Sequence, residues 1–126
     1  MSKRLETLDR KVIYILARVG IPVKKKIFLK ILKKLREKGV NLGIEIYELN
    51  NELVSPTLDE IVDKLVERGY LRVLYTLDKS DYGGLYTEVY SPTDKAKKML
   101  EKPKFGKKDK KTIDQVIERL RRRSRG

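Results

Sequence analysis

The chain has 126 residues, enough for one ordinary domain, and its charged fraction of 39% is well above the usual level of about 25%. Thirty-one lysines and arginines against eighteen acids give a net charge of +13, and histidine and cysteine are absent. This composition excludes disulfides, thiolate metal sites and histidine general bases, and it favours polyanionic partners.

Two amphipathic helices are predicted near the N-terminus. Apolar residues recur at helical spacing over residues 5–18, and Gly20 and Pro22 then break the pattern. A second apolar stripe predicts a helix over residues 23–38, with Gly39 at its C-terminal end. Two interpretations of the first helix stay open: it covers the domain's own core, or it forms a homodimer.

Two further helices are predicted in the middle of the chain. Residues 44–53 fit a short helix. A longer helix starts at Ser55, whose hydroxyl can cap it, with Pro56 in the first position and Gly69 at the end.

A two-stranded hairpin and a closing helix are predicted next. Residues 70–77 and 85–90 are rich in β-branched residues, aromatic residues and leucine, and they flank a polar loop. A short helix is predicted over residues 92–101, and the lysine-rich residues 102–111 are typical of a linker. The folded domain is therefore expected to end near Glu101.

A last amphipathic helix is predicted beyond the linker, where Thr112 and Gln115 fit a capping box. Its C-terminal end is rich in arginine, which is suited to binding phosphate, and the segment could be disordered until it binds. Its apolar face over residues 113–120 could instead form a partner helix or a homodimer arm. An anionic membrane surface is disfavoured because that face has no Trp or Phe.

The order of these elements and several local motifs resemble the winged helix-turn-helix superfamily, as found in microbial and archaeal transcriptional regulators. The resemblance covers about residues 24–101 and depends on Tyr47-Glu48-Leu49, Leu53-Val54-Ser55-Pro56-Thr57-Leu58, Leu65-Val66-Glu67-Arg68-Gly69-Tyr70-Leu71 and Tyr90-Ser91-Pro92-Thr93-Asp94-Lys95-Ala96, where Ala96 replaces the usual glycine.

The resemblance implies an α+β fold with a three-helix core and a two-stranded wing over residues 23–101. Residues 1–22 would then hold an extra N-terminal helix, and residues 102–126 a basic linker and helical tail. Residues 40–43 would add a small third strand. The resemblance also implies that the third helix enters the major groove of duplex DNA.

The distribution of charge disagrees with that insertion. Residues 41–69 contain seven acids and two basic residues, and several acids beside phosphates would be repelled. Basic residues concentrate elsewhere, since residues 23–38 contain eight against one acid and residues 102–126 contain eleven against three.

We expect these two basic segments to supply most of the affinity for nucleic acid, with duplex DNA favoured over single strands or RNA. The lysines of residues 23–38 would follow a phosphate backbone, although a solvated helix face is the alternative. The residues expected to contact nucleic acid are Lys24, Lys25, Lys26, Lys30, Lys33, Lys34, Ser55, Thr57, Lys64, Arg72, Lys79, Tyr82, Arg119, Arg121, Arg122, Arg123 and Arg125.

The sequence thus predicts a DNA-binding transcriptional regulator. The alternative is a winged-helix interaction module of a transcription or replication assembly, which docks a basic protein partner on the acidic face formed by Glu60, Asp63 and Glu67.

We expect no catalysis, no cofactor and no metal. The first ten residues lack the apolar core of a signal peptide, and no segment has the ~18 apolar residues of a membrane span, so a cytoplasmic protein without membrane contact is expected. The scarcity of glutamine and asparagine beside abundant lysine, glutamate and isoleucine resembles the composition of proteins from hyperthermophiles.

Overall fold

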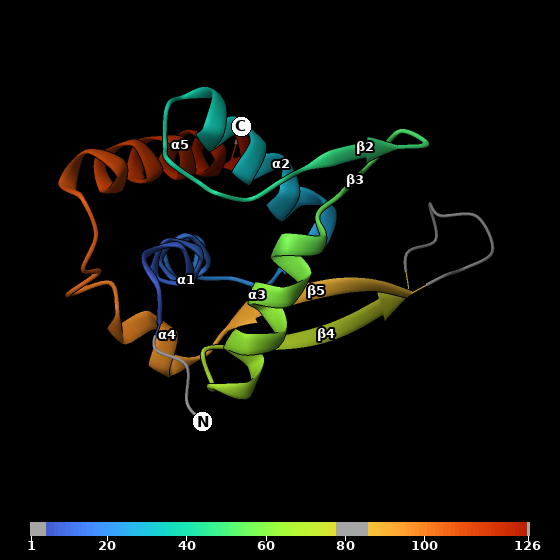
Figure 1. The fold of residues 1–126 in the computed structure, drawn as a ribbon, viewed down its shortest axis with the longest axis horizontal. Coiled ribbons are helices and arrows are strands. Elements are labelled where there is room, and N and C mark those ends of the chain that lie inside the picture. Colours follow the sequence, from blue (N-terminus) through green and yellow to red (C-terminus); the bar gives the residue numbers. More distant parts are fainter. Residues whose placement is uncertain (1–4, 78–85, 126) are drawn as a thin grey trace.

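The computed structural model of the chain describes residues 5–77 and 86–125 and has an α+β fold (Figure 1). In chain order the elements are α1 (Thr7–Val19), β1 (Val23–Lys24), α2 (Lys25–Glu37), β2 (Tyr47–Leu49), β3 (Glu52–Val54), α3 (Pro56–Glu67), β4 (Leu71–Leu77), β5 (Tyr86–Pro92), α4 (Asp94–Lys98) and α5 (Lys107–Arg125). Across the described ranges, no helix is long and apolar enough to cross a membrane.

The strands form a three-stranded sheet and a separate hairpin. β1, β5 and β4 lie in that order and are antiparallel, with Val23 and Val73 on either side of Tyr90. β2 and β3 pair with each other. In Figure 1 the β2–β3 hairpin and the β4–β5 ribbon extend away from the helices toward the same side of the molecule.

The helix predicted from Ser55 is confirmed. The Ser55 hydroxyl accepts a hydrogen bond from the backbone N–H of Leu58 at 3.2 Å, and Pro56 is the first helical residue. The chain leaves this helix through Gly69, whose φ of 81° is the left-handed conformation that glycine adopts readily.

The helix predicted over residues 44–53 is wrong, because this segment contains β2 and β3. Asn50 and Asn51 have φ values of 51° and 66° and connect the two strands as a two-residue turn. Asparagine tolerates this left-handed conformation, and such turns match the twist of an antiparallel hairpin. The Asn-Asn pair therefore decides the structure of a segment whose apolar spacing is ambiguous.

Other predicted boundaries also change. The third strand of the sheet is β1, immediately before α2, whereas residues 40–43 form no strand. The closing helix is limited to Asp94–Lys98, so it is shorter than the predicted residues 92–101. α5 begins at Lys107, which places the end of the segment predicted as a linker inside a helix.

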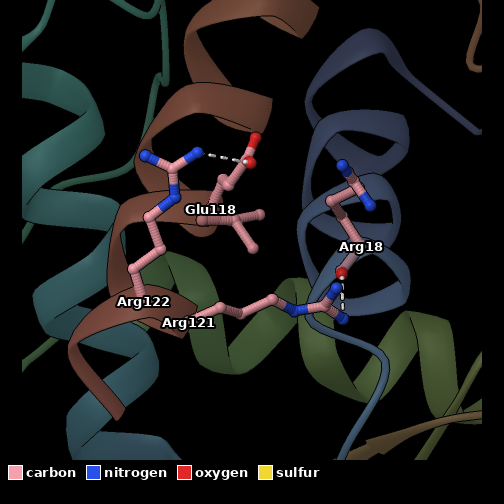
Figure 2. Close-up of a pocket in the computed structure, with 5 residues that line it drawn as sticks. Arg18, Glu118, Arg121 and Arg122 are labelled. Atoms are coloured by element: carbon pink, nitrogen blue, oxygen red, sulfur yellow. Dashed lines mark hydrogen bonds and ion pairs between the residues drawn. The ribbon is translucent and has the colours of Figure 1, made fainter. Parts of the chain in front are cut away.

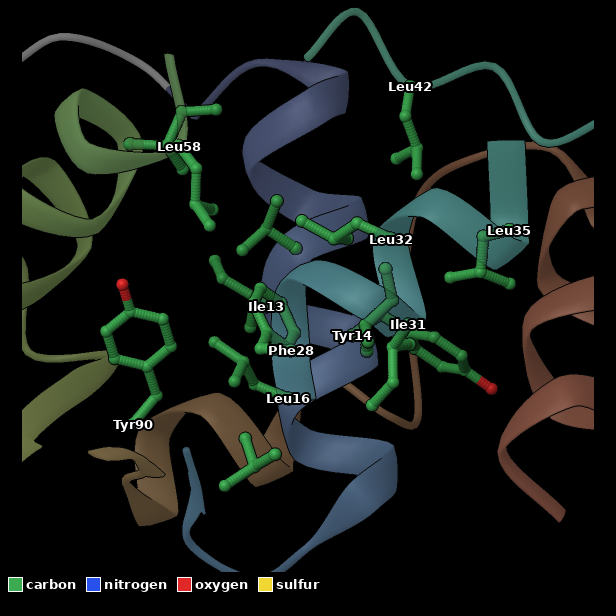
Figure 3. Packing of buried hydrophobic residues seen from close by; sticks show 14 of the residues in the cluster. Ile13, Tyr14, Leu16, Phe28, Ile31, Leu32, Leu35, Leu42, Leu58 and Tyr90 are labelled. Carbon is green, nitrogen blue, oxygen red and sulfur yellow. The ribbon is translucent and has the colours of Figure 1, made fainter. Parts of the chain in front are cut away.

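α1 lies at the centre of the hydrophobic core (Figure 3). All its residues from Lys11 to Ala17 are buried, because α3, α4, α5 and β5 contact this helix. The same apolar cluster includes Phe28 of α2, Leu58 of α3 and Ile113 of α5. α1 is therefore a core helix, in contrast to the extra helix predicted from the resemblance.

The two apolar faces predicted to form a homodimer are covered within the chain itself. The face over residues 5–18 belongs to α1, and on α5 the side chains of Ile113, Val116 and Ile117 are at most 5% exposed. Of the two interpretations of the first helix, cover of the domain's own core is the one observed. The homodimer interpretation through residues 5–18 or 113–120 is corrected accordingly.

Buried polar residues of α1 connect it to distant segments. Asp9, which is 3% exposed, accepts a hydrogen bond from the backbone N–H of Glu6 at 2.8 Å and pairs with Lys64 of α3. Lys11, 5% exposed, lies 2.8 Å from a carboxylate oxygen of Asp109 at the start of α5. A buried charge is costly unless it is paired, so these contacts fix α1 against α3 and α5.

Candidate nucleic-acid interface

α2 presents a row of exposed lysines, which we call the lysine ridge: Lys26, Lys30, Lys33 and Lys34. The opposite side of the helix is buried in the core. Among the described residues, no acid lies within ion-pair distance of Lys30, Lys33 or Lys34. A helix rises about 1.5 Å per residue, so the ridge extends about 12 Å, far enough to meet more than one phosphate.

α5 lies beside α2 and enlarges the basic area (Figure 1). Its outer side carries exposed basic residues, including Lys108, Lys111 and Arg119, and its inner side is the apolar face that covers α1 and α2. We call the lysine ridge together with these three residues the α2–α5 surface. The two basic segments predicted from the sequence are thus on neighbouring helices.

A pocket of about 260 Å³ lies where α5 meets the C-terminal end of α1 (Figure 2). The Arg121 guanidinium donates to the backbone carbonyls of Arg18 and Val19 at 3.1 and 2.8 Å, and so caps α1. Arg122 pairs with Glu118 at 3.2 Å. The pocket is lined by Arg18, Ile117, Glu118, Arg121 and Arg122. The Arg121 guanidinium is thereby held by α1, whereas Arg122 is largely exposed.

The three residues of the α3 segment predicted to reach DNA are buried or half-buried. Ser55 is 1% exposed and its hydroxyl is occupied as the N-cap. Thr57 is half-buried, and the half-buried Lys64 pairs with Asp9 of α1. The expectation that these residues position the helix or contact bases stays a prediction, and Ser55 and Lys64 already have partners within the chain.

The remaining predicted residues are exposed, half-buried or outside the described part of the chain. Arg72 is exposed on β4, and Lys24 is half-buried in β1. Lys25 is also half-buried, and its ammonium lies 2.7 Å from Asp59 and 3.8 Å from Glu88. The predictions for Lys79 and Tyr82, and for the side chains of Arg123 and Arg125, fall outside the described residues.

The outer side of α3 is acidic, as the charge map predicted. Glu60, Asp63 and Glu67 are exposed, and in the described ranges no basic side chain lies within ion-pair distance of them. This side of the molecule would repel a phosphate backbone. It is unsuited to the standard entry of a recognition helix into the major groove.

The β4–β5 ribbon carries an exposed apolar surface that the predicted contact residues do not include. Leu74 and Leu77 of β4 are 46% and 55% exposed, and Tyr75 and Tyr86 are 62% and 73% exposed. The sequence indicates such a surface, because residues 70–77 are apolar at almost every position. Such a strand carries apolar side chains on both faces, and a two-stranded ribbon cannot bury both.

Asp114 joins α5 to α1. The Tyr14 hydroxyl donates a hydrogen bond to the Asp114 carboxylate at 2.6 Å, and Arg18 lies 3.2 Å from the same oxygen. Lys110, one turn earlier on α5, lies 3.1 Å from the other oxygen. Burial and the Asp114 carboxylate both raise the pKa of Tyr14 above its ordinary value of 10.0.

Tyr14 and Tyr90 are expected to make the folded state sensitive to alkaline pH. Burial, and then the charge of Glu88, raise the pKa of Tyr90 as well. A raised pKa contributes stability that is complete below about pH 10 and is lost as the pH rises through the folded-state values. The free energy of unfolding, measured with urea between about pH 8 and 11, should therefore fall above pH 10.

The absorbance of the tyrosine phenolates gives an independent check. Part of the absorbance increase should coincide with loss of helical circular dichroism, and Tyr90→Phe should reduce that part. A single early transition of all seven tyrosines, with the helices intact, would contradict the burial of Tyr14 and Tyr90.

Comparisons of the chain with protein-family models, with curated proteins and with solved structures find no match. The arguments about function therefore depend on the fold and on the distribution of charge and apolar surface.

Proposed function

We propose that the chain is a winged helix-turn-helix protein that binds duplex DNA through the α2–α5 surface. The resemblance implies a three-helix core, a small third strand and a two-stranded wing. α1, α2 and α3 can form the three-helix core, and β1 can be the small third strand. β4 and β5 can form the wing, in the sheet order β1-β5-β4. On this assignment α1 is the first core helix, and the β2–β3 hairpin is inserted between α2 and α3.

The observation that carries the proposal is the row of exposed lysines on α2, beside the basic outer side of α5. Within the described part of the chain, Lys30, Lys33 and Lys34 have no acid within ion-pair distance. Lysines held at helical spacing can neutralise successive phosphates and release their counterions, which supplies affinity without reading sequence. The acidic outer side of α3 argues against base contacts from that helix. Regulation of transcription, which the resemblance implies, would then require specificity from DNA shape or from a partner.

The dependence of binding on salt tests this proposal. The full chain is titrated against fluorescein-labelled duplex DNA, single-stranded DNA and RNA of equal length, over a range of salt concentrations. We expect tighter binding to the duplex, with log K falling against log salt at a slope of about −5 if about six phosphates are neutralised. A flat salt dependence, or equal affinity for all three nucleic acids, would count against it.

A further inference from the structure

The part of the β4–β5 ribbon that the helices do not cover has an exposed apolar area. Cross-strand partners share a face of a sheet, and Tyr75 pairs with Glu88 while Leu77 pairs with Tyr86. Two residues nearer the core, on the same face, Tyr90 packs edge-to-face against Phe28 of α2 with ring centroids 5.8 Å apart. The face that is covered by helices at Tyr90 is therefore left exposed farther along the ribbon.

The acids of α3 border this same face. Lys25 links Asp59 of α3 to Glu88 of β5, so α3 and the ribbon approach each other here. Lys25 neutralises part of that charge. Asp63 and Glu67, farther along α3, keep theirs, and both are exposed. Asp63 and Glu67 lie toward the end of α3 from which β4 starts, and the apolar area lies toward the far end of the ribbon, so a segment that contacts both must extend along the ribbon. Exposed apolar area combined with unneutralised acids is typical of an interaction surface.

The hydroxyl of Tyr90 is buried where β5 faces α3. Tyr90 is fully buried, and its hydroxyl has no hydrogen-bond partner among the described residues. Figure 3 shows this hydroxyl pointing toward the part of α3 that carries Leu58. The charges of Glu88, Asp59 and Asp63 act on it. A buried polar group without a partner is costly, so this hydroxyl is a local cost in the packing between β5 and α3.

The chemistry of the surface defines the occupant. Acids exclude a phosphate backbone, and the described residues contain no cluster of three or more acids suited to a metal ion. We propose that α3 and the β4–β5 ribbon form a docking face for a basic protein segment, which places lysine or arginine beside Asp63 and Glu67 and an apolar side chain against Tyr75, Leu77 and Tyr86. Charge complementarity supplies orientation, and the aromatic anchors supply affinity.

The docking face and the α2–α5 surface share no residue, so the inference does not depend on DNA binding. If both surfaces are occupied, each partner contacts its own set of residues. The chain could then join a basic protein to a nucleic acid, with opposite charges on the two surfaces keeping the two partners apart.

Selection from a random twelve-residue peptide library displayed on phage tests the inference, with the full chain as bait. The enriched peptides are synthesised with fluorescein and titrated against the wild type and two variants. We expect enriched peptides that combine lysine or arginine with aromatic or aliphatic residues. Their affinity should fall at least ten-fold for Asp63→Lys/Glu67→Lys and, separately, for Tyr75→Thr/Leu77→Thr.

Matched controls make the result specific. Glu37→Lys/Glu101→Lys changes the net charge by the same amount at exposed positions away from the face and should leave peptide affinity unchanged. Circular dichroism and thermal melting of each variant establish that it is folded. Failure to enrich any peptide, enrichment of acidic peptides, or equal affinity for all variants would each overturn the inference.

Two other occupants are tested in parallel. Sedimentation velocity of the wild type reports self-association, and an association that Asp63→Lys/Glu67→Lys abolishes would assign the face to a second copy of the chain. A labelled single-stranded oligonucleotide whose binding is lost in Tyr75→Thr/Leu77→Thr would assign it to stacked bases. Either result overturns the assignment to a basic protein segment.

Discussion

Replacing Lys30, Lys33 and Lys34 together by glutamate is expected to weaken duplex DNA binding by roughly two orders of magnitude at low salt. These lysines are exposed on α2 and have no acidic partner within the described chain, so their charge is available to phosphates. Each lost phosphate contact should also make the slope of log K against log salt shallower by about one. Anisotropy titrations at several salt concentrations measure both quantities.

The control for this prediction carries the same change of net charge at another place. Lys97→Glu, Lys98→Glu and Lys102→Glu alter three exposed lysines in and just after α4. The loss of affinity in this triple variant should be several-fold smaller than in the Lys30, Lys33 and Lys34 variant. Its slope of log K against log salt should stay unchanged. An equal loss in both triple variants would mean that DNA responds to the overall charge of the protein, and the α2–α5 surface would then not be the binding site.

The helices that the sequence predicts well are those decided by short-range features. Apolar spacing within a few turns predicts α1 and α2, and Ser55 with Pro56 predicts the start of α3. Each feature acts between residues a few positions apart, so it can be recognised without the tertiary structure. The β2–β3 hairpin shows that two local features can conflict: apolar spacing favours a helix over residues 44–53, and the Asn50-Asn51 turn, which is equally local, favours the hairpin that is observed.

The position of α5 could not be predicted in the same way. Its apolar stripe indicates only that some surface covers it, and that surface could be another chain, a membrane or this domain. The contacts that decide between them join distant residues, such as Tyr14 and Asp114, which are 100 positions apart. The central position of α1 also depends on contacts between distant residues, because α3, α5 and β5 pack against this helix.

The residues of the candidate site also divide into those that short-range patterns predict and those that depend on contacts between distant residues. The lysine ridge is predictable, because helical spacing alone puts its side chains opposite the apolar stripe. The pairing of Lys64 could not be predicted in this way, because its partner, Asp9, is 55 positions away in the sequence. Ser55 is a third case, in which one hydroxyl could either cap the helix or contact DNA, and the structure assigns it to the cap.

Ile113→Ala is expected to lower the free energy of unfolding by about 2–5 kcal/mol. Ile113 is fully buried in the cluster that contains α1, so its removal leaves a cavity inside the main core. Urea titration followed by circular dichroism measures the change, and a lower midpoint with an unchanged slope would report lost stability within an otherwise intact fold. A chain ending at Glu101 is a less informative variant, because it would expose the apolar side of α1 that α5 covers.

Ile21→Ala provides the matched control for the same chemical change at the surface. Ile21 is 64% exposed, so its substitution should alter the free energy of unfolding by no more than about 0.5 kcal/mol. If Ile113→Ala were equally harmless, α5 would be detached from the core in solution. Its basic residues would then act as a free tail, and the α2–α5 surface would not exist as a single binding surface. The stability measurement therefore tests the proposed interface as well as the fold.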